Sequence, residues 1–272
     1  MFISAFVSDL DGTMWSTDMS MHRETLAVVA LLENADIPLV IATGRRAQSA
    51  LVGLAMNGLD ELPGILMNGA LARDSLRGDS FLSETIAPGD ARAVLGTFLE
   101  LGLEPIVYID HPEVDMIVGS DPAASPAYVA NAPGVRTAVD LESVVDEDPV
   151  IGFGAFGFPR AALDSIAESI DSAESASAIV AESLYEGDHG IMIQGLGVDK
   201  ITGVSAWCRR HDVDETRLAV IGDGANDIGM LSAAAFAIVP ANAPGDVRAL
   251  ADHVIPPANE GGWCEIGGIL NL

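Results

Sequence analysis

Short runs of apolar residues recur along the chain, and a polar turn and an amphipathic segment follow most of them. Three runs end in turns rich in Gly, Asp or Thr and predict buried parallel strands, at residues 2–8, 37–42 and 218–221. Two more, at residues 64–67 and 236–240, end in turns that contain Asn. Amphipathic helices are predicted between the strands, at residues 21–34, 46–56, 200–211, 227–234 and 243–251.

This alternation of strands and helices predicts an α/β fold with a doubly wound parallel (Rossmann-like) core sheet. In such a sheet the ligand site lies outside the carboxyl ends of the strands. Candidate functional residues are therefore expected in the turns that directly follow the apolar runs.

Residues 85–186 follow a different pattern, with more Pro and more acidic residues. Their strands alternate between apolar and polar positions, and they lie among helices at 90–101 and 160–170; the strands are predicted at residues 105–110, 115–120, 150–156 and 178–185. This predicts an α+β module with one solvated sheet face. Because the α/β pattern resumes afterwards, we expect a catalytic core of residues 1–84 and 187–272 with an inserted α+β cap domain.

The composition excludes several classes of partner. With 49% hydrophobic residues the chain can build a core, and 40 acidic against 13 basic side chains give a net charge of −27. We expect no nucleic-acid partner and no membrane association, since both need basic clusters. The charge is equally compatible with a salty cytoplasm and with a general bias against Lys.

The cysteines and histidines carry no pattern typical of a functional site. Two cysteines, Cys208 and Cys264, provide neither a disulfide framework nor a Cys-based metal site, and Cys208 is predicted to be a small buried hydrophobe. The histidines are scattered and are interpreted as structural or surface residues: His22, His111, His189, His211 and His253. Without a signal peptide or an apolar stretch of membrane length, the protein is expected to be cytoplasmic, as a monomer or weak homodimer.

Two carboxylates follow the first strand directly, in Asp9-Leu10-Asp11-Gly12-Thr13. Residues two apart in extended chain point the same way, so Asp9 and Asp11 are expected to face one pocket. An Asp-rich turn or a Ca²⁺ loop is the alternative. However, a strand precedes this segment and no bidentate acid closes the loop, so a functional pair is favoured.

A second acidic turn, from Gly222 to Asp227, follows the strand at 218–221. Asp223 and Asp227 would meet the first pair at the same edge of the sheet. So many acids imply a hard divalent cation, and oxygen ligands favour Mg²⁺. The alternative, a Gly/Asn/Asp turn with Asp227 as helix N-cap, leaves the density of acids unexplained.

Lys200 is the only lysine beside 12 arginines, and it opens a predicted helix. A compact ammonium is suited to bridging a carboxylate and a phosphate oxygen. At the end of the second strand, Thr43, Gly44 and Arg45 could form a phosphate cradle, or Thr43 could be an ordinary N-cap. Asn68 and Asn242, also at strand ends, are weaker candidates.

Taken in order, these motifs resemble the haloacid dehalogenase-like superfamily of phosphatases. Asp9 and Asp11 match its D-x-D-G-T motif, Thr43 the second, Lys200 the third, and Asp223 with Asp227 match G-D-x-x-x-D. The T-G-R, N-G-A, D-K-x-x-G and G-D-G-x-N-D-x-x-M segments resemble its Cof-type branch, which carries a large inserted α+β cap. Trp15, where an aliphatic residue is commoner, and Pro-Ala-Asn-Ala before the last helix are departures that remove no catalytic group.

The resemblance implies a phosphatase of small metabolites, sugar phosphates above all. Its catalytic residues would be Asp9 as nucleophile, Asp11 as general acid/base, Thr43 and Lys200. Mg²⁺ would be held by Asp9, Asp11 (through its backbone carbonyl), Asp223 and Asp227, with Asp227 also orienting Lys200. Gly44, Arg45 and Asn226 are the expected substrate-binding residues.

Three alternatives stay open from the sequence. A phosphomutase would share the core but return the phosphoryl group to a hexose phosphate. A haloalkanoate dehalogenase would need neither Asp11 nor a metal. A non-catalytic phosphorylatable switch would need no cap.

Overall fold

The computed structural model describes residues 3–16, 18–124, 126–174, 176–182 and 189–272. The chain divides into two compact units. The first consists of Met1–Arg45, Gly53–Leu82 and Asp199–Leu272, and the second of Arg46–Val52 and Ser83–Val198.

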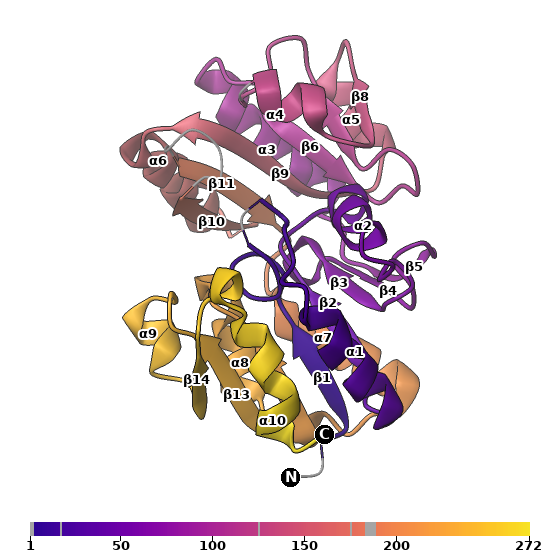
Figure 1. The fold of residues 1–272 in the computed structure, drawn as a ribbon. Coiled ribbons are helices and arrows are strands. Elements are labelled where there is room, and N and C mark those ends of the chain that lie inside the picture. The colour runs from indigo at the N-terminus through magenta and orange to yellow at the C-terminus, as the bar shows by residue number, and fades with distance from the viewer. Residues whose placement is uncertain (1–2, 17, 125, 175, 183–188) are drawn as a thin grey trace. The chain divides into compact units, whose positions relative to one another are not determined.

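Within the described residues, eight strands form the sheet of the first unit, in the order β14-β13-β12-β1-β2-β3-β4-β5 (Figure 1). Their bounds are β1 Ala5–Ser8, β2 Leu39–Ala42, β3 Gly64–Leu66, β4 Leu71–Arg73, β5 Ser80–Ser83, β12 Leu218–Ile221, β13 Phe236–Pro240 and β14 His253–Ile255. Neighbours from β14 to β3 pair in parallel, whereas β3 and β4 are antiparallel. The predicted α/β class with a parallel core sheet is confirmed.

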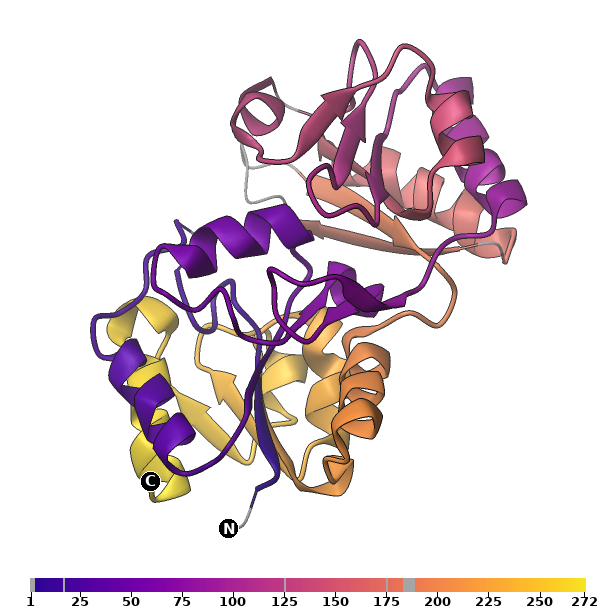
Figure 2. The ribbon, with the colours of Figure 1, turned by 90° about the vertical axis from the view of Figure 1, so that its right-hand side faces the viewer.

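Helices cover both faces of this sheet (Figure 2). Helices α1 (Thr25–Asn34) and α10 (Ile266–Leu270) lie on one face, and α7 (Lys200–His211) and α8 (Ile228–Ala233) on the other. Ala5 and Val7 pack with the apolar residues of α7 and α8. Phe6 meets Trp263 edge to face on the opposite side, as expected from the period of two along a strand.

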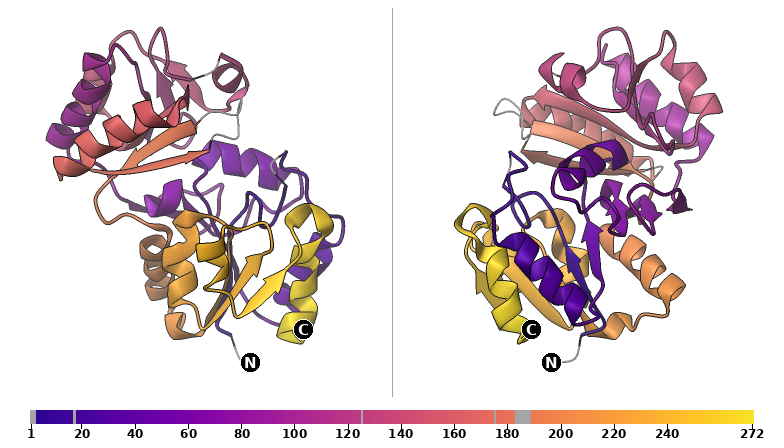
Figure 3. Two further views of the ribbon diagram at one scale, coloured as in Figure 1. Left: turned by 90° about the vertical axis from the view of Figure 1, so that its left-hand side faces the viewer. Right: turned by 45° about the vertical axis from the view of Figure 1, so that its right-hand side comes forward.

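The second unit contains a six-stranded sheet among its described residues, in the order β10-β11-β9-β6-β7-β8. Its strands are β6 Ile106–Ile109, β7 Met116–Val118, β8 Val135–Thr137, β9 Val150–Phe158, β10 Ser177–Glu182 and β11 His189–Gln194. One apolar cluster joins this sheet to three helices, which lie on one of its faces (Figure 3): α3 Pro88–Glu100, α5 Leu141–Glu147 and α6 Arg160–Ser172. Helix α4 (Pro126–Asn131) belongs to the same unit.

The boundary expected at residue 186 differs from the structure. Residues 187–198 were expected in the core, but β11 pairs with both β9 and β10 and therefore belongs to the second unit. Residues 46–52 also fall in that unit. The sequence pattern missed β11 because only three of its six residues are strongly apolar.

The expected solvated face is wrong for β6 and β7, where every position is buried. On β6 the hydroxyl of Tyr108 lies 3.5 Å from that of Tyr128 in α4, so that helix covers part of the second face. Residue 2, the end of the strand expected at 178–185 (residues 183–185) and the boundary residue 186 lie outside the described residues.

The helix bounds also differ from the expected ones in the first unit. Helix α1 begins at Thr25 rather than residue 21, and α9 is only Gly245–Arg248. Helix α2 is Ala47–Ala55, within one residue of its expected bounds.

Within the described part of the chain, no helix combines the length and apolarity needed to cross a membrane.

Candidate active site

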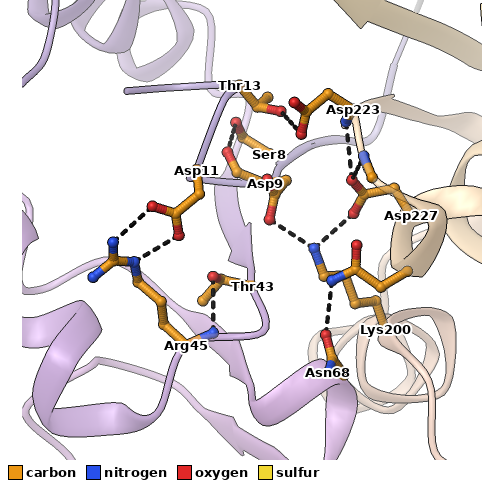
Figure 4. A network of polar contacts seen from close by, with 12 residues as sticks. Ser8, Asp9, Asp11, Thr13, Thr43, Arg45, Asn68, Lys200, Asp223 and Asp227 are labelled. Carbon is orange, nitrogen blue, oxygen red and sulfur yellow. Dashed lines mark hydrogen bonds and ion pairs between the residues drawn. The ribbon is translucent and has the colours of Figure 1, made fainter. Parts of the chain in front are cut away.

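Three adjacent strands end where the candidate residues begin. In the parallel register Ser8 of β1 lies opposite Ile221 of β12 and Ile41 of β2. Asp9 follows directly after β1, and its backbone N–H donates to the carbonyl of Ile221 at 3.0 Å. The turns that carry Asp223 and Thr43 therefore start on either side of Asp9, at the carboxyl edge of the sheet (Figure 4).

Lys200 is the buried centre of the site. It is the first residue of α7, with Asp199 as N-cap, and none of its side chain is exposed. Its Nζ donates to Asp9 Oδ1 and to Asp227 Oδ1, each at 2.6 Å. A Cβ at Gly69 would lie 1.9 Å from the carbonyl oxygen of Asp199, so only glycine lets this turn approach the start of α7.

Burial and charge oppose each other in this ion pair. Burial raises the pKa of Asp9 well above its usual value, although Lys200 acts in the opposite direction. Burial alone would lower the pKa of Lys200, but Asp227 and Asp9 outweigh it, so that this pKa is raised. Lys200 is therefore a permanent cation at the sheet edge, with two carboxylates against it.

Asp223 is held by two donors and one close glycine. Thr13 Oγ1 donates to its Oδ1 at 3.2 Å, and Asn242 Nδ2 donates to its Oδ2 at 2.9 Å. A Cβ at Gly12, whose φ is +76°, would lie 2.3 Å from the Asp223 Oδ2. Burial, followed by the charge of Asp227, raises the pKa of Asp223 to about 6.

Asp227 uses both carboxylate oxygens inside the protein. Oδ1 accepts from Lys200, while Oδ2 accepts from the backbone N–H groups of Asp223 (2.9 Å) and Gly224 (2.8 Å). Its side chain is fully buried. These contacts tie the acidic turn to Lys200, which matches the expected orienting role more closely than a direct ligand role.

Asp11 lies apart from this cluster and is gripped by Arg45. The guanidinium donates through Nε to Oδ2 at 2.6 Å and through Nη2 to Oδ1 at 2.7 Å. Trp15 Nε1 donates to Oδ1 at 3.0 Å, and the guanidinium lies 5.3 Å from the centre of the Trp15 ring. The residue expected to clamp substrate is thus paired with the expected acid/base.

The remaining candidates line the turn after β2. Thr43 Oγ1 accepts from the backbone N–H of Arg45 at 3.1 Å and keeps its own O–H to donate. The alternative of Thr43 as an ordinary N-cap is wrong, because α2 begins only at Ala47. Asn226 Nδ2 donates to Asn68 Oδ1 at 2.8 Å. A Cβ at Gly44 would lie 2.9 Å from the same Asn68 oxygen, so these three residues meet closely.

The acidic residues have the composition of a cation site. Ligand atoms of Asp9, Asp223 and Asp227 all lie within 4.8 Å of one another. Lys200 neutralises one of these three negative charges, and Arg45 separately neutralises the charge of Asp11. When all three acids are ionised, two negative charges are left over, which a divalent cation with a preference for oxygen ligands would balance.

The family model of the haloacid dehalogenase-like hydrolases matches residues 6–265, nearly the whole chain. The chain belongs to this family. The resemblance inferred from the motifs is therefore confirmed, and the protein is a hydrolase of the haloacid dehalogenase-like type.

Several known proteins are similar along nearly their full length. A phosphoglycolate phosphatase from Methanopyrus kandleri is 25% identical over 259 residues, covering 94% of this chain and 92% of that one. Among solved structures, TM0651 from Thermotoga maritima has a TM-score of 0.82 at 22% identity, with 98% and 96% of the two chains covered. The subclass IIB sugar phosphatase BT4131 has a TM-score of 0.76 at 21% identity, with 98% of each chain covered. These structural likenesses concern the fold.

Several residues of this hydrolase site were missed or undervalued in the sequence. Thr13 and Asn242 hold Asp223, and Trp15 holds Asp11. Asn242 gave a weak signal, an amide directly after a strand, and Trp15 stood out as a departure from the motif. Behind the site Trp263 Nε1 donates to Ser8 Oγ at 3.0 Å, and Ser8 donates to the carbonyl of Asp9 at 2.7 Å.

Proposed function

We propose that this hydrolase is a Mg²⁺-dependent phosphatase that hydrolyses phosphate monoesters of small metabolites through an aspartyl-phosphate on Asp9. The observation that carries the proposal is the pairing of Asp9 with Lys200 at 2.6 Å, at a sheet edge where Asp223 and Asp227 add two more carboxylates. A nucleophilic carboxylate beside a fixed cation is suited to receiving an anionic phosphoryl group.

In the first step a carboxylate oxygen of Asp9 attacks phosphorus, and the bond from phosphorus to the leaving oxygen breaks. Asp11, in its protonated form, gives its proton to that oxygen. Lys200 and the hydroxyl of Thr43 donate to the phosphoryl oxygens and stabilise the charge that spreads over them.

In the second step Asp11 takes a proton from water, which attacks the phosphorus of the aspartyl-phosphate. Phosphate leaves and the carboxylate of Asp9 is regenerated. Arg45 holds both oxygens of Asp11, and this pair must open before Asp11 can transfer a proton.

We assign this opening to the anionic substrate, which attracts the guanidinium of Arg45 and so frees Asp11. Arg45 then binds substrate while Asp11 acts as the acid/base.

The expected metal fits the donors that are present. Asp9, Asp223 and the backbone carbonyl of Asp11 would hold Mg²⁺, and Asp227 would act through Lys200 and the turn at Asp223. Bound Mg²⁺ supplies charge neutralisation for the phosphate. Purely oxygen donors favour Mg²⁺ over softer metals.

The substrate class is the finer part of the proposal. We assign the second unit the role of a cap that excludes water and contributes to specificity, as expected from its insertion in the core. Sugar phosphates are the first candidates, supported by the name of the subclass IIB sugar phosphatase. The Methanopyrus kandleri relative makes 2-phosphoglycolate a second candidate.

A panel of phosphorylated metabolites, including hexose phosphates and 2-phosphoglycolate, tests this proposal by phosphate release with and without Mg²⁺. We expect release from at least one small monoester, dependent on Mg²⁺ and absent in Asp9→Asn. Transfer of the phosphoryl group to another position of a sugar, with no free phosphate, would instead identify a mutase. Stable phosphorylation without turnover would identify a switch.

A further inference from the structure

A second group of metal-binding side chains lies apart from the acidic site, in the same unit. His22 and Glu24 come from the segment that leads into α1, and Cys264 comes from the 3₁₀ helix η5 (Gly262–Glu265), which packs against α1. Ligand atoms of these three residues lie within 4.8 Å of one another, although 242 positions separate His22 from Cys264. None of the three residues has a role in the proposed reaction.

The hydrogen bonds indicate which atom holds the proton between His22 and Cys264. The backbone N–H of Glu24 donates to His22 Nδ1 at 3.3 Å, so this nitrogen is an acceptor. The same Nδ1 lies 3.1 Å from Cys264 Sγ, and the hydrogen of that contact therefore belongs to the thiol. The one in-plane lone pair of Nδ1 therefore faces both the backbone N–H of Glu24 and the thiol hydrogen, and of these two the thiol hydrogen is the one that a metal can replace.

The backbone at Gly261 lies against the imidazole of His22. A Cβ at Gly261 would lie 3.3 Å from both Cε1 and Nε2 of His22, so the ring rests against the backbone there. Gly261 has φ +79°, a conformation that favours glycine. The turn that precedes η5 therefore contacts the ring of His22, and η5 itself carries Cys264.

We propose that His22, Glu24 and Cys264 form a second metal site, for Zn²⁺. A thiolate, an imidazole and a carboxylate are the ligands of zinc, with water as the fourth, whereas Mg²⁺ prefers oxygen alone. Tetrahedral bonds to nitrogen and sulfur place these atoms about 3.5 Å apart, so His22 Nδ1 and Cys264 Sγ need to separate by only a few tenths of an ångström. Zn²⁺ takes the place of the thiol proton, which leaves to solvent.

The metal links two parts of the chain that are distant in sequence. It joins the entry to α1 to the C-terminal segment that also contains Trp263, whose indole donates to Ser8 in β1, the strand that directly precedes Asp9. Metal bound only by the folded state stabilises that state. The metal would therefore stabilise the fold, and the site does not rest on the proposed phosphatase function.

Cobalt is the probe for this site, because a thiolate bound to Co²⁺ gives an intense near-ultraviolet charge-transfer band. Metal-free protein is saturated with Mg²⁺ to fill the acidic site and then titrated with Co²⁺. We expect one equivalent to produce the sulfur band, and Zn²⁺ to abolish it by displacement. Cys264→Ser and His22→Gln should lose the band, and Glu24→Gln should bind Co²⁺ at least about tenfold more weakly.

The other cysteine is the matched control. Cys208 is buried in α7 and has no place in the cluster, so Cys208→Ser should keep the band. Zn²⁺ should also raise the thermal unfolding midpoint of the wild type and of Cys208→Ser but not of Cys264→Ser. Absence of the band in the wild type, or its persistence in Cys264→Ser, would overturn the assignment and leave a simple thiol–imidazole hydrogen bond.

Discussion

Arg45 holds both carboxylate oxygens of Asp11, through Nε at 2.6 Å and Nη2 at 2.7 Å. Such a bidentate pair is strong and keeps Asp11 in a single orientation. The indole of Trp15 adds a third donor, at 3.0 Å from Oδ1. Because the proposed reaction needs Asp11 to give and take a proton, the indole that orients it should affect turnover more than substrate binding.

Trp15→Phe removes the indole N–H and keeps an aromatic ring in a fully buried position. Loss of one hydrogen bond to a charged group is worth about 1.5–3 kcal/mol. We expect kcat to fall by about tenfold or more, with KM little changed, because Asp11 is held less firmly in the orientation that proton transfer needs. Steady-state kinetics measure both parameters.

Trp207→Phe is the control for that variant. Within the described residues Trp207 Nε1 is buried and has no hydrogen-bond partner, so its removal leaves no acceptor unpaired. We expect unchanged kcat, with a loss of stability only from the cavity that the smaller ring leaves. Equal kinetic effects from both substitutions would contradict a positioning role for Trp15.

Lys200→Met should both inactivate and destabilise the protein, since it leaves Asp9 and Asp227 buried without their shared cation. Removing one partner of a buried ion pair costs about 3–5 kcal/mol. Burial already raises the pKa of Asp9, and without Lys200 it rises further. The deficit should therefore shrink as pH falls and the carboxylate of Asp9 takes up a proton, and grow as pH rises.

Urea unfolding of wild type and Lys200→Met at pH 5 and pH 8, without divalent cations, measures that difference. A deficit that is the same at both pH values would mean that lost packing rather than uncompensated charge explains it.

Gly12→Ala should weaken the cation site. The new Cβ would lie 2.3 Å from Asp223 Oδ2 and would push this carboxylate away, at a backbone with φ +76°. We expect the Mg²⁺ concentration for half-maximal activity to rise by about tenfold or more, by analogy with the loss of an outer-sphere contact. Calorimetric titration of Mg²⁺ gives the same quantity without turnover.

Gly58→Ala is the control that separates backbone strain at a positive φ from displacement of the Asp223 carboxylate. Gly58 also has a positive φ, of +69°, but a Cβ there would meet nothing within 4 Å. It should cost about 1 kcal/mol of stability, as expected for alanine at a positive φ, and leave the Mg²⁺ requirement unchanged. If both variants behaved alike, the contact of Gly12 with Asp223 would not matter.

The α/β core was readable from the sequence because its strands are buried on both faces and appear as continuous apolar runs. The strands at 218–221 and 236–240 and the helix at 200–211 have the predicted bounds. The motif residues follow these elements, so the topology alone brings Asp9, Asp223 and Lys200 together. Strands such as β11, with few apolar residues, gave no comparable signal.

Contacts between distant segments were not readable in this way. The sequence pattern favours a structural or surface role for His22 and gives Cys264 no metal site, yet His22 Nδ1 and Cys264 Sγ lie 3.1 Å apart. Nothing local marks such a pair, because it forms only when the C-terminal segment packs on α1. The ion pair between Arg45 and Asp11 could not be predicted from the sequence for the same reason, since 34 positions separate the two residues.

The proposed phosphoryl group on Asp9 can be trapped during turnover. The Mg²⁺-saturated enzyme is mixed with a substrate found in the panel, quenched in acid within milliseconds, and its peptides are examined by mass spectrometry after borohydride reduction of the acyl phosphate. We expect homoserine at position 9 and nowhere else, and none in Asp9→Asn. Phosphate release without any modification of Asp9, or at the wild-type rate in Asp9→Asn, would contradict it.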